Sequence, residues 1–130
     1  RAVGPGPNAS GWLVGIEDPF RPDSDIGGIR VRDGAVATST AARRRWHTPA
    51  GWAHHLIDPA TGMSAATGLL SVTVVAATAT DAEVLAKTVF LMGMGAGLSY
   101  IESRDGCGAV LVPEQGMPVW SLKMEELREY

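Results

Sequence analysis

The strongest constraint on the fold is an apolar strand followed almost at once by an amphipathic helix. Residues 69–77 (LLSVTVVAA) are mostly apolar and rich in β-branched side chains, a composition that predicts a buried central strand. Apolar residues then recur at helical spacing and form one face, which is typical of a helix packed on a sheet: Ala82, Leu85, Ala86, Val89 and Phe90.

The ends of this helix also carry recognisable signals. Thr80 is a natural N-cap, and Glu83 three residues later completes a capping box. Gly93 and Gly95 follow the last apolar turn and are expected to end the helix. A second short helix is predicted directly afterwards, over residues 97–103.

Shorter strands and turns surround this unit. We expect a turn-rich loop over residues 4–11, with strands and further loops at the following positions: a strand over 12–16, a β-hairpin over 26–38 turning at Asp33-Gly34, a loop over 39–53, a short strand over 54–57, and a strand pair over 109–112 and 118–122. Strands, hairpins and separate helices together predict an α+β fold with a mixed, largely antiparallel sheet flanked by helices.

Composition limits the classes of protein that this chain can belong to. Its 130 residues are 45% apolar and 19% charged, which indicates one folded globular domain rather than a disordered segment. The net charge of −3 argues against a nucleic-acid surface, and no apolar stretch approaches the ~20 residues that a membrane-spanning helix needs. Cys107 is the single cysteine, so an internal disulfide is excluded.

The segment His54–Gly62 (HHLIDPATG) concentrates groups that can carry chemistry. Two imidazoles precede a carboxylate, a rigid proline turn and a hydroxyl, an arrangement that suits a general base beside a turn that accepts phosphate. Neighbouring side chains on a strand point to opposite faces, so only one histidine can face a site. The other is expected to pack or to be solvated, and the segment alone also fits a purely structural role.

HHLIDPATG closely resembles the signature HHIIDPxTG of the ApbE family, the FAD:protein FMN transferases. Further segments fall in the family's order: residues 11–19 as a strand ending in a proline turn, residues 36–39 as the TSG segment with Thr40 in place of glycine, and residues 72–93 as the unit ADALATALFxxG. The resemblance covers nearly the whole chain but only about the last half of the family's domain. Residues 1–130 are therefore expected to form the C-terminal part of an ApbE-like domain, incomplete without an N-terminal segment.

The resemblance implies an activity and a set of site residues. Family members bind FAD and transfer its FMN half onto a threonine or serine of a partner protein, releasing AMP. By resemblance, His55 is the base, the Ile57 backbone contacts the nucleotide, and Thr38 and Ser39 belong to the cofactor site. Asp58 is expected near the pyrophosphate, where with Thr61 it shapes the turn. A non-catalytic FAD-binding protein and an FAD pyrophosphatase are the alternatives.

The positions that hold Mg²⁺ in the family are altered here. They fall on the Glu83 carboxylate, the Ala86 carbonyl and Lys87, where the family has threonine. A lysine ammonium has three donors and no lone pair, so it cannot bind a metal ion. Either Lys87 and Glu83 form an ordinary surface ion pair, or the Lys87 ammonium takes the place of the ion and meets the FAD pyrophosphate directly.

Some properties stay open at this level. The arginines at 43–45 suit a phosphate, an acidic partner or a solvated loop, and no tryptophan is assigned a ligand. The chain starts at Arg1 without a methionine, so we expect a preceding N-terminal half that completes the site. Besides FAD and FMN, the expected partners are that half and a flavin-accepting protein. The compartment, bacterial and either cytoplasmic or extracytoplasmic, is not specified.

Overall fold

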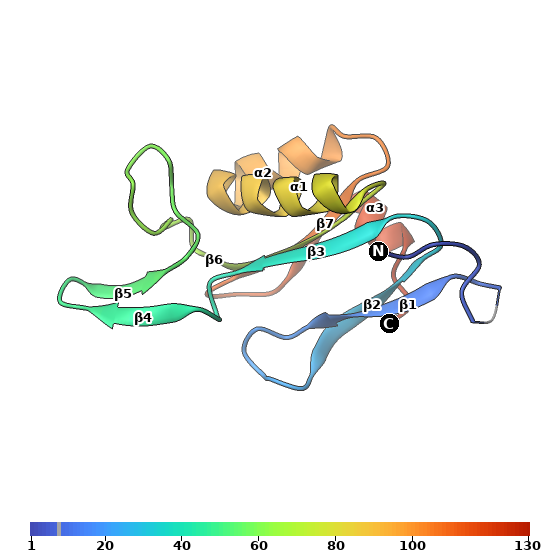
Figure 1. Ribbon diagram of the computed structural model, residues 1–130, viewed down its shortest axis with the longest axis horizontal. Coiled ribbons are helices and arrows are strands. Elements are labelled where there is room, and N and C mark those ends of the chain that lie inside the picture. Colours follow the sequence, from blue (N-terminus) through green and yellow to red (C-terminus); the bar gives the residue numbers. More distant parts are fainter. Residues whose placement is uncertain (8) are drawn as a thin grey trace.

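The computed structural model describes residues 1–7 and 9–130 and arranges them in three layers (Figure 1). Asn8, within the loop expected over residues 4–11, lies outside the described residues. The middle layer is a four-stranded sheet in the order β3-β6-β7-β8, formed by Ala35–Thr40, Leu69–Ala76, Gly108–Pro113 and Val119–Trp120. Two helices cover one face: α1 (Ala79–Met92) and α2 (Met94–Glu102). The predicted α+β fold is confirmed, and all strand pairs in the described residues are antiparallel.

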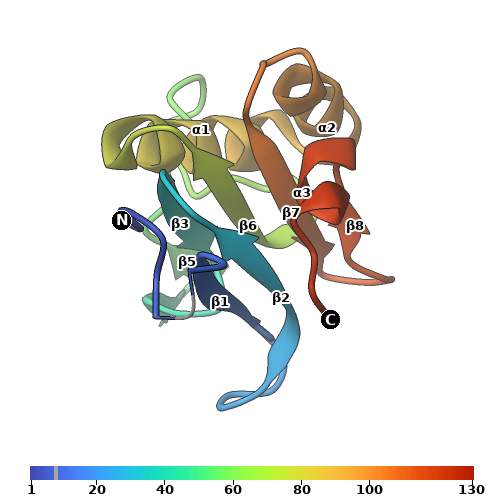
Figure 2. The same cartoon turned by 90° about the vertical axis from the view of Figure 1, so that its right-hand side faces the viewer.

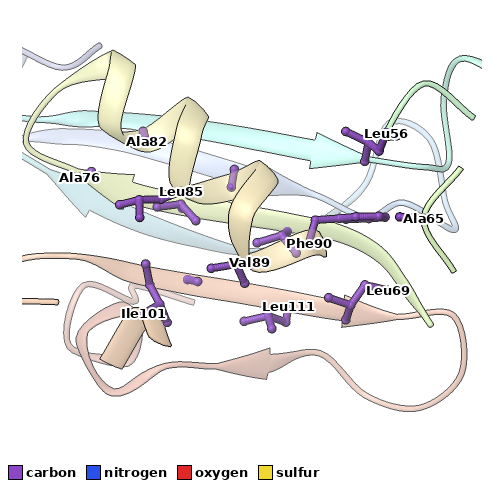
Figure 3. Close-up of a cluster of buried hydrophobic side chains, with 14 of the residues drawn as sticks. Leu56, Ala65, Leu69, Ala76, Ala82, Leu85, Val89, Phe90, Ile101 and Leu111 are labelled. Carbon is purple, nitrogen blue, oxygen red and sulfur yellow. The ribbon is translucent and has the colours of Figure 1, made fainter. Parts of the chain in front are cut away.

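The main core lies between α1 and the sheet (Figure 3). All eight residues of β6 are buried, as the apolar composition of this strand predicts, and β6 lies inside the sheet between β3 and β7. The helix buries the face expected from its spacing, and Phe90 and Val89 are completely inaccessible to solvent. Leu56, within the histidine segment, and Ala65, which follows it in sequence, lie beside Phe90 in the same core.

A second core fills the opposite side of the sheet. The antiparallel pair β1 (Trp12–Glu17) and β2 (Asp25–Val31) packs there together with α3 (Leu122–Glu126), as Figure 2 shows from the side. Alternation along the central strands divides their side chains between the layers, because successive residues face opposite sides. The buried residues of this core are Ile16, Ile29, Val31, Val75, Val110, Val112 and Met124.

The expected hairpin over residues 26–38 is wrong. The Asp33-Gly34 turn is present, but β2 pairs with β1, whereas β3 pairs along its whole length with β6. The chain therefore passes from one sheet to the other at this turn. Gly34 adopts a φ of 148°, and a Cβ there would lie 2.8 Å from the carbonyl oxygen of Ala76, so close backbone approach explains the glycine.

The expected loop over residues 39–53 is also wrong, because this stretch contains a β-hairpin. Strands β4 (Arg45–Thr48) and β5 (Gly51–His54) pair with each other and extend from one end of the molecule (Figure 1). Correspondingly, the strand expected over 54–57 is reduced to His54, the last residue of β5, and an isolated bridge at Ile57.

Helix α1 begins two residues earlier than the capping pattern suggested. Thr78, not Thr80, is the N-cap, and its Oγ1 accepts a hydrogen bond of 3.0 Å from the Asp81 backbone N–H. The same hydroxyl donates to the Asp81 carboxylate at 2.7 Å. The helix ends at Gly93 as expected, and α2 follows directly, three residues earlier than predicted. No helix in the described residues is long and apolar enough to cross a membrane.

Phe90 is the side chain on which the main core depends most. Phe90→Ala should lower the free energy of unfolding by about 3–5 kcal/mol, because it removes a fully buried ring and leaves a cavity. Val84, on the exposed side of the same helix, provides the control: Val84→Ala should stay within about 0.5 kcal/mol. Urea unfolding followed by circular dichroism measures both values, and equal losses would contradict this packing.

Candidate active site

The two adjacent histidines at the end of β5 have different environments. The Nε2 atom of His54 lies 2.9 Å from the Ala65 carbonyl oxygen, and its Nδ1 accepts a bond of 3.2 Å from the Leu56 N–H. Because Nδ1 accepts this backbone N–H, Nε2 carries the proton and donates to Ala65. Its edge also faces the Phe90 ring, with 6.0 Å between the ring centroids. His54 therefore anchors the segment to the core.

His55 lies on the exposed side of the segment, as strand alternation predicts. Partial burial is the main cause that lowers the pKa of its imidazole below the ordinary value, and the positive charges of Arg44 and Lys87 act in the same direction. A lowered pKa keeps the ring neutral at neutral pH, the form in which histidine can accept a proton. Of the two imidazoles, His55 is the exposed one.

Ser64 holds the histidine segment from the other side of its turn. Its Oγ accepts a bond of 2.9 Å from the His54 N–H and donates one of 2.7 Å to the His54 carbonyl oxygen. The backbone of Ala65 continues this contact by donating to the Leu56 carbonyl at 2.9 Å. The sequence analysis did not identify Ser64, because a serine two residues after a turn has no distinctive pattern.

The backbone N–H and C=O groups of Ile57 point away from the segment with which Ile57 pairs. Ile57 pairs with Ser64 in an isolated antiparallel bridge, and the flanking bonds run from Asp58 N to Met63 O and from Ala65 N to Leu56 O. In such a non-hydrogen-bonded pair, the N–H and C=O groups of Ile57 point outward. The Ile57 side chain is 46% exposed, and the expected contact of this backbone with the nucleotide stays a prediction.

Asp58 stabilises the turn that follows. Its Oδ1 accepts a bond of 2.9 Å from the Ala60 N–H, and its carbonyl oxygen accepts bonds from the N–H groups of Thr61 and Gly62. The Thr61 hydroxyl in turn accepts a bond of 3.2 Å from the Met63 N–H. Both side chains therefore support the turn through local hydrogen bonds.

Thr38 and Ser39 lie on opposite faces of β3. Ser39 is buried on the same face as Ala35 and Ala37, the face that packs under α1. Thr38 points to the other side of the sheet, where its hydroxyl lies 2.8 Å from that of Thr73. The structure thus places Ser39, but not Thr38, on the side of the sheet that carries α1.

Glu83 and Lys87 form an ion pair one turn apart on α1. The Lys87 Nζ lies 2.5 Å from Glu83 Oε2, and both side chains are about half exposed. Ala86 is fully buried, and its carbonyl lies inside the helix, where it accepts the regular bond from Phe90. Among Glu83, Ala86 and Lys87, only Glu83 has a carboxylate, and that carboxylate is already paired with the Lys87 ammonium.

These residues do not fit a magnesium site. Mg²⁺ requires near-octahedral oxygen coordination, but the Lys87 ammonium offers no lone pair. No group of three or more histidine, cysteine, aspartate or glutamate side chains converges anywhere in residues 1–7 and 9–130.

The β4–β5 hairpin brings basic and aromatic side chains to the vicinity of His55. Arg43 pairs with Glu17, whereas the Arg45 guanidinium lies 4.9 Å from the Trp52 ring centroid, in a cation–π contact. Arg44, with a φ of 51°, is close enough to act on the pKa of His55. Sequence analysis noted the three arginines, but it could not separate their roles without the hairpin.

The sequence and the fold match those of known flavin transferases. Over residues 1–111 the sequence matches the ApbE family. It is 34% identical over 102 residues to the FAD:protein FMN transferase of Treponema pallidum (strain Nichols), covering 78% of this chain and 28% of that protein. Over the same length it is 26% identical to the FAD:protein FMN transferase of Klebsiella pneumoniae (strain 342), covering 32% of that protein.

Solved structures give the same result. The ApbE protein of Thermotoga maritima MSB8 superimposes with a TM-score of 0.80 and 31% identity, covering 92% of this chain and 38% of the other. The flavin transferase ApbE of Vibrio cholerae has the same fold, with a TM-score of 0.73 at 24% identity over 90% of this chain. The chain belongs to the ApbE family. It spans about a third of the length of the curated relatives it matches.

The different environments of the two histidines lead to a stability prediction. His54→Ala should lower the free energy of unfolding by about 1–3 kcal/mol, because it leaves the Ala65 carbonyl and the Leu56 N–H without a partner. His55→Ala should change it by no more than about 0.5 kcal/mol. Urea unfolding of the two variants distinguishes them, and the reverse order would contradict the assignment of His54 as the anchor.

A second prediction concerns the titration of His55. Removing a nearby positive charge stabilises the imidazolium, so Lys87→Gln should raise the His55 pKa toward its ordinary value. Because folding lowers this pKa, the stability that neutral His55 contributes is complete above the ordinary pKa and is lost as the pH falls below it. The NMR shifts of the His55 ring report the titration. Lys123→Gln is the control and should leave it unchanged.

Proposed function

We propose that this chain forms part of an FAD:protein FMN transferase, which moves FMN from FAD onto a threonine or serine of a partner protein and releases AMP. The observation that carries the proposal is the histidine pair. One imidazole is fixed in the core by both of its nitrogens, and the next one is exposed, neutral and near two basic side chains. This combination provides a proton acceptor next to a place for an anion.

The proposed reaction is a displacement at phosphorus. The hydroxyl oxygen of the partner's threonine or serine forms a bond to the phosphorus on the FMN side of the FAD pyrophosphate. His55 accepts the hydroxyl proton, and the bond between that phosphorus and the bridging oxygen breaks. AMP leaves with the bridging oxygen, and FMN remains attached to the partner through a phosphoester.

Other residues of the chain would bind the nucleotide. The outward N–H and C=O groups of Ile57 are available to polar atoms of FAD, and the turn stabilised by Asp58 fixes their direction. Ser39 lies on the side of the sheet that carries α1. Thr38 lies on the other face, so it would support the nucleotide site only through its bond with Thr73. Since the relatives are about three times as long, we propose that further parts of the site come from outside these 130 residues.

The role of His55 can be tested with all three histidines of the chain. In the protein at its natural length, His55→Ala should slow AMP release from FAD and covalent flavin transfer by about 10²–10⁴-fold, the usual contribution of a general base. His47→Ala, on the β4–β5 hairpin, is the matched control and should keep the rate of the unmodified protein. His54→Ala should lose activity only in proportion to the fraction of protein that unfolds.

The products distinguish this function from the alternatives. Transfer leaves flavin fluorescence on the partner after denaturing electrophoresis, together with one AMP per flavin. AMP without labelled partner would instead identify an FAD pyrophosphatase, and FAD binding without AMP would identify a non-catalytic binding protein. Equal losses in His55→Ala and His47→Ala would contradict the assignment of His55 as the base.

A further inference from the structure

Lys87 is held in a fixed position beside the candidate site. It lies on α1, which buries one whole face against the sheet, and Phe90, one turn further along, contacts the His54 ring. The chain therefore connects Lys87 to the histidine segment through a packed, rigid contact. Glu83 restrains the ammonium further, because it binds Lys87 Nζ at 2.5 Å.

The chain's other lysine shows that this position is specific. Lys123 also pairs with a glutamate on its own helix, Glu126, at 2.8 Å and with similar exposure. However, Lys123 lies on α3, on the opposite face of the sheet from α1. Exposed ion pairs of this kind stabilise a protein little, so either lysine can exchange its carboxylate for a stronger anion at small cost.

The charged side chains that act on the His55 ring, Arg44 and Lys87, are both basic, although the whole chain has a net charge of −3. Arg44 and Lys87 lie near the ring, whereas Glu83 is the carboxylate bound to Lys87. Arg43 is neutralised by Glu17 and so adds little. A positively charged site can bind an anionic group such as a pyrophosphate. No metal ion is then needed to make the charge of the site positive.

We infer that Lys87 is a built-in cation that binds the pyrophosphate of FAD in place of the magnesium ion that its position serves in the ApbE family. This inference rests on the proposed function, since it names how the same site holds its substrate. The ammonium neutralises part of the pyrophosphate charge and donates hydrogen bonds to its oxygens. Glu83 would first release the Lys87 ammonium. The ammonium would then bind the substrate on one side and Glu83 on the other.

The test is FAD binding to the protein at its natural length, measured by flavin fluorescence and calorimetry with either EDTA or magnesium chloride. The unmodified protein should bind FAD equally well in both solutions. With EDTA, Lys87→Gln should bind FAD about 10–100-fold more weakly, because a charge-assisted hydrogen bond is lost. Riboflavin, which has no phosphate, should bind both proteins alike, and Lys123→Gln should match the unmodified protein.

A second variant restores oxygen donors to the same positions. Glu83→Asp combined with Lys87→Thr should regain affinity for FAD in magnesium and lose it again in EDTA. Two results would overturn the inference alone: tenfold weaker binding of FAD to the unmodified protein in EDTA, or unchanged binding in Lys87→Gln. Failure of the unmodified protein to bind FAD in either solution would overturn the proposed function itself.

Discussion

The burial of one face of α1 against β6 is the interaction on which the candidate site depends. It is apolar and well packed, with Phe90 and Val89 fully buried, so the helix has one fixed position on the sheet. The residues near the candidate site take their positions from this contact. The His54 ring meets Phe90, and Glu83 and Lys87 extend from the exposed side of the same helix. The polar site is therefore positioned by an apolar core that takes no part in its chemistry.

Two neighbouring residues of the same type have different environments because of the geometry of an extended chain. Side chains of successive residues face opposite directions, so His54 turns inward and His55 outward. The inner ring uses both nitrogens to hold the backbone, and the outer ring is exposed. Fixing His54 also fixes the backbone from which His55 extends. This is why the two residues need to be adjacent.

The sequence predicted the elements whose patterns are determined by burial. The strand β6 and the apolar face of α1 follow from periodicity, whereas alternation predicted only that His54 and His55 face opposite sides, and the choice of His55 came from the resemblance. Predictions based on local signals were less successful. Thr78 and Thr80 are each followed three residues later by an acidic residue, Asp81 or Glu83, so the capping pattern alone could not choose between them.

Pairing between distant segments was outside the reach of local patterns. The Asp33-Gly34 turn is typical of a hairpin, yet β3 gains more by pairing with the buried β6 than by returning along β2. The β4–β5 hairpin was missed because half of its residues are exposed and the other half only partly buried, which removes the alternation that reveals a strand. Alternation also separates two neighbouring residues of β3. The Thr38 hydroxyl lies on the face of the sheet opposite α1, whereas Ser39 lies under the helix.

The exposed β4–β5 hairpin has a consequence for how this family can diversify. Trp52 is 65% exposed, and the hairpin joins the rest of the chain at His54, which the core and Ser64 already hold. Changes in the length or sequence of the hairpin therefore need not move the histidine pair. Under the proposed function, selection could alter this arm to suit different acceptor proteins while His55 keeps its place, so that recognition and chemistry would evolve at separate rates within a dozen residues.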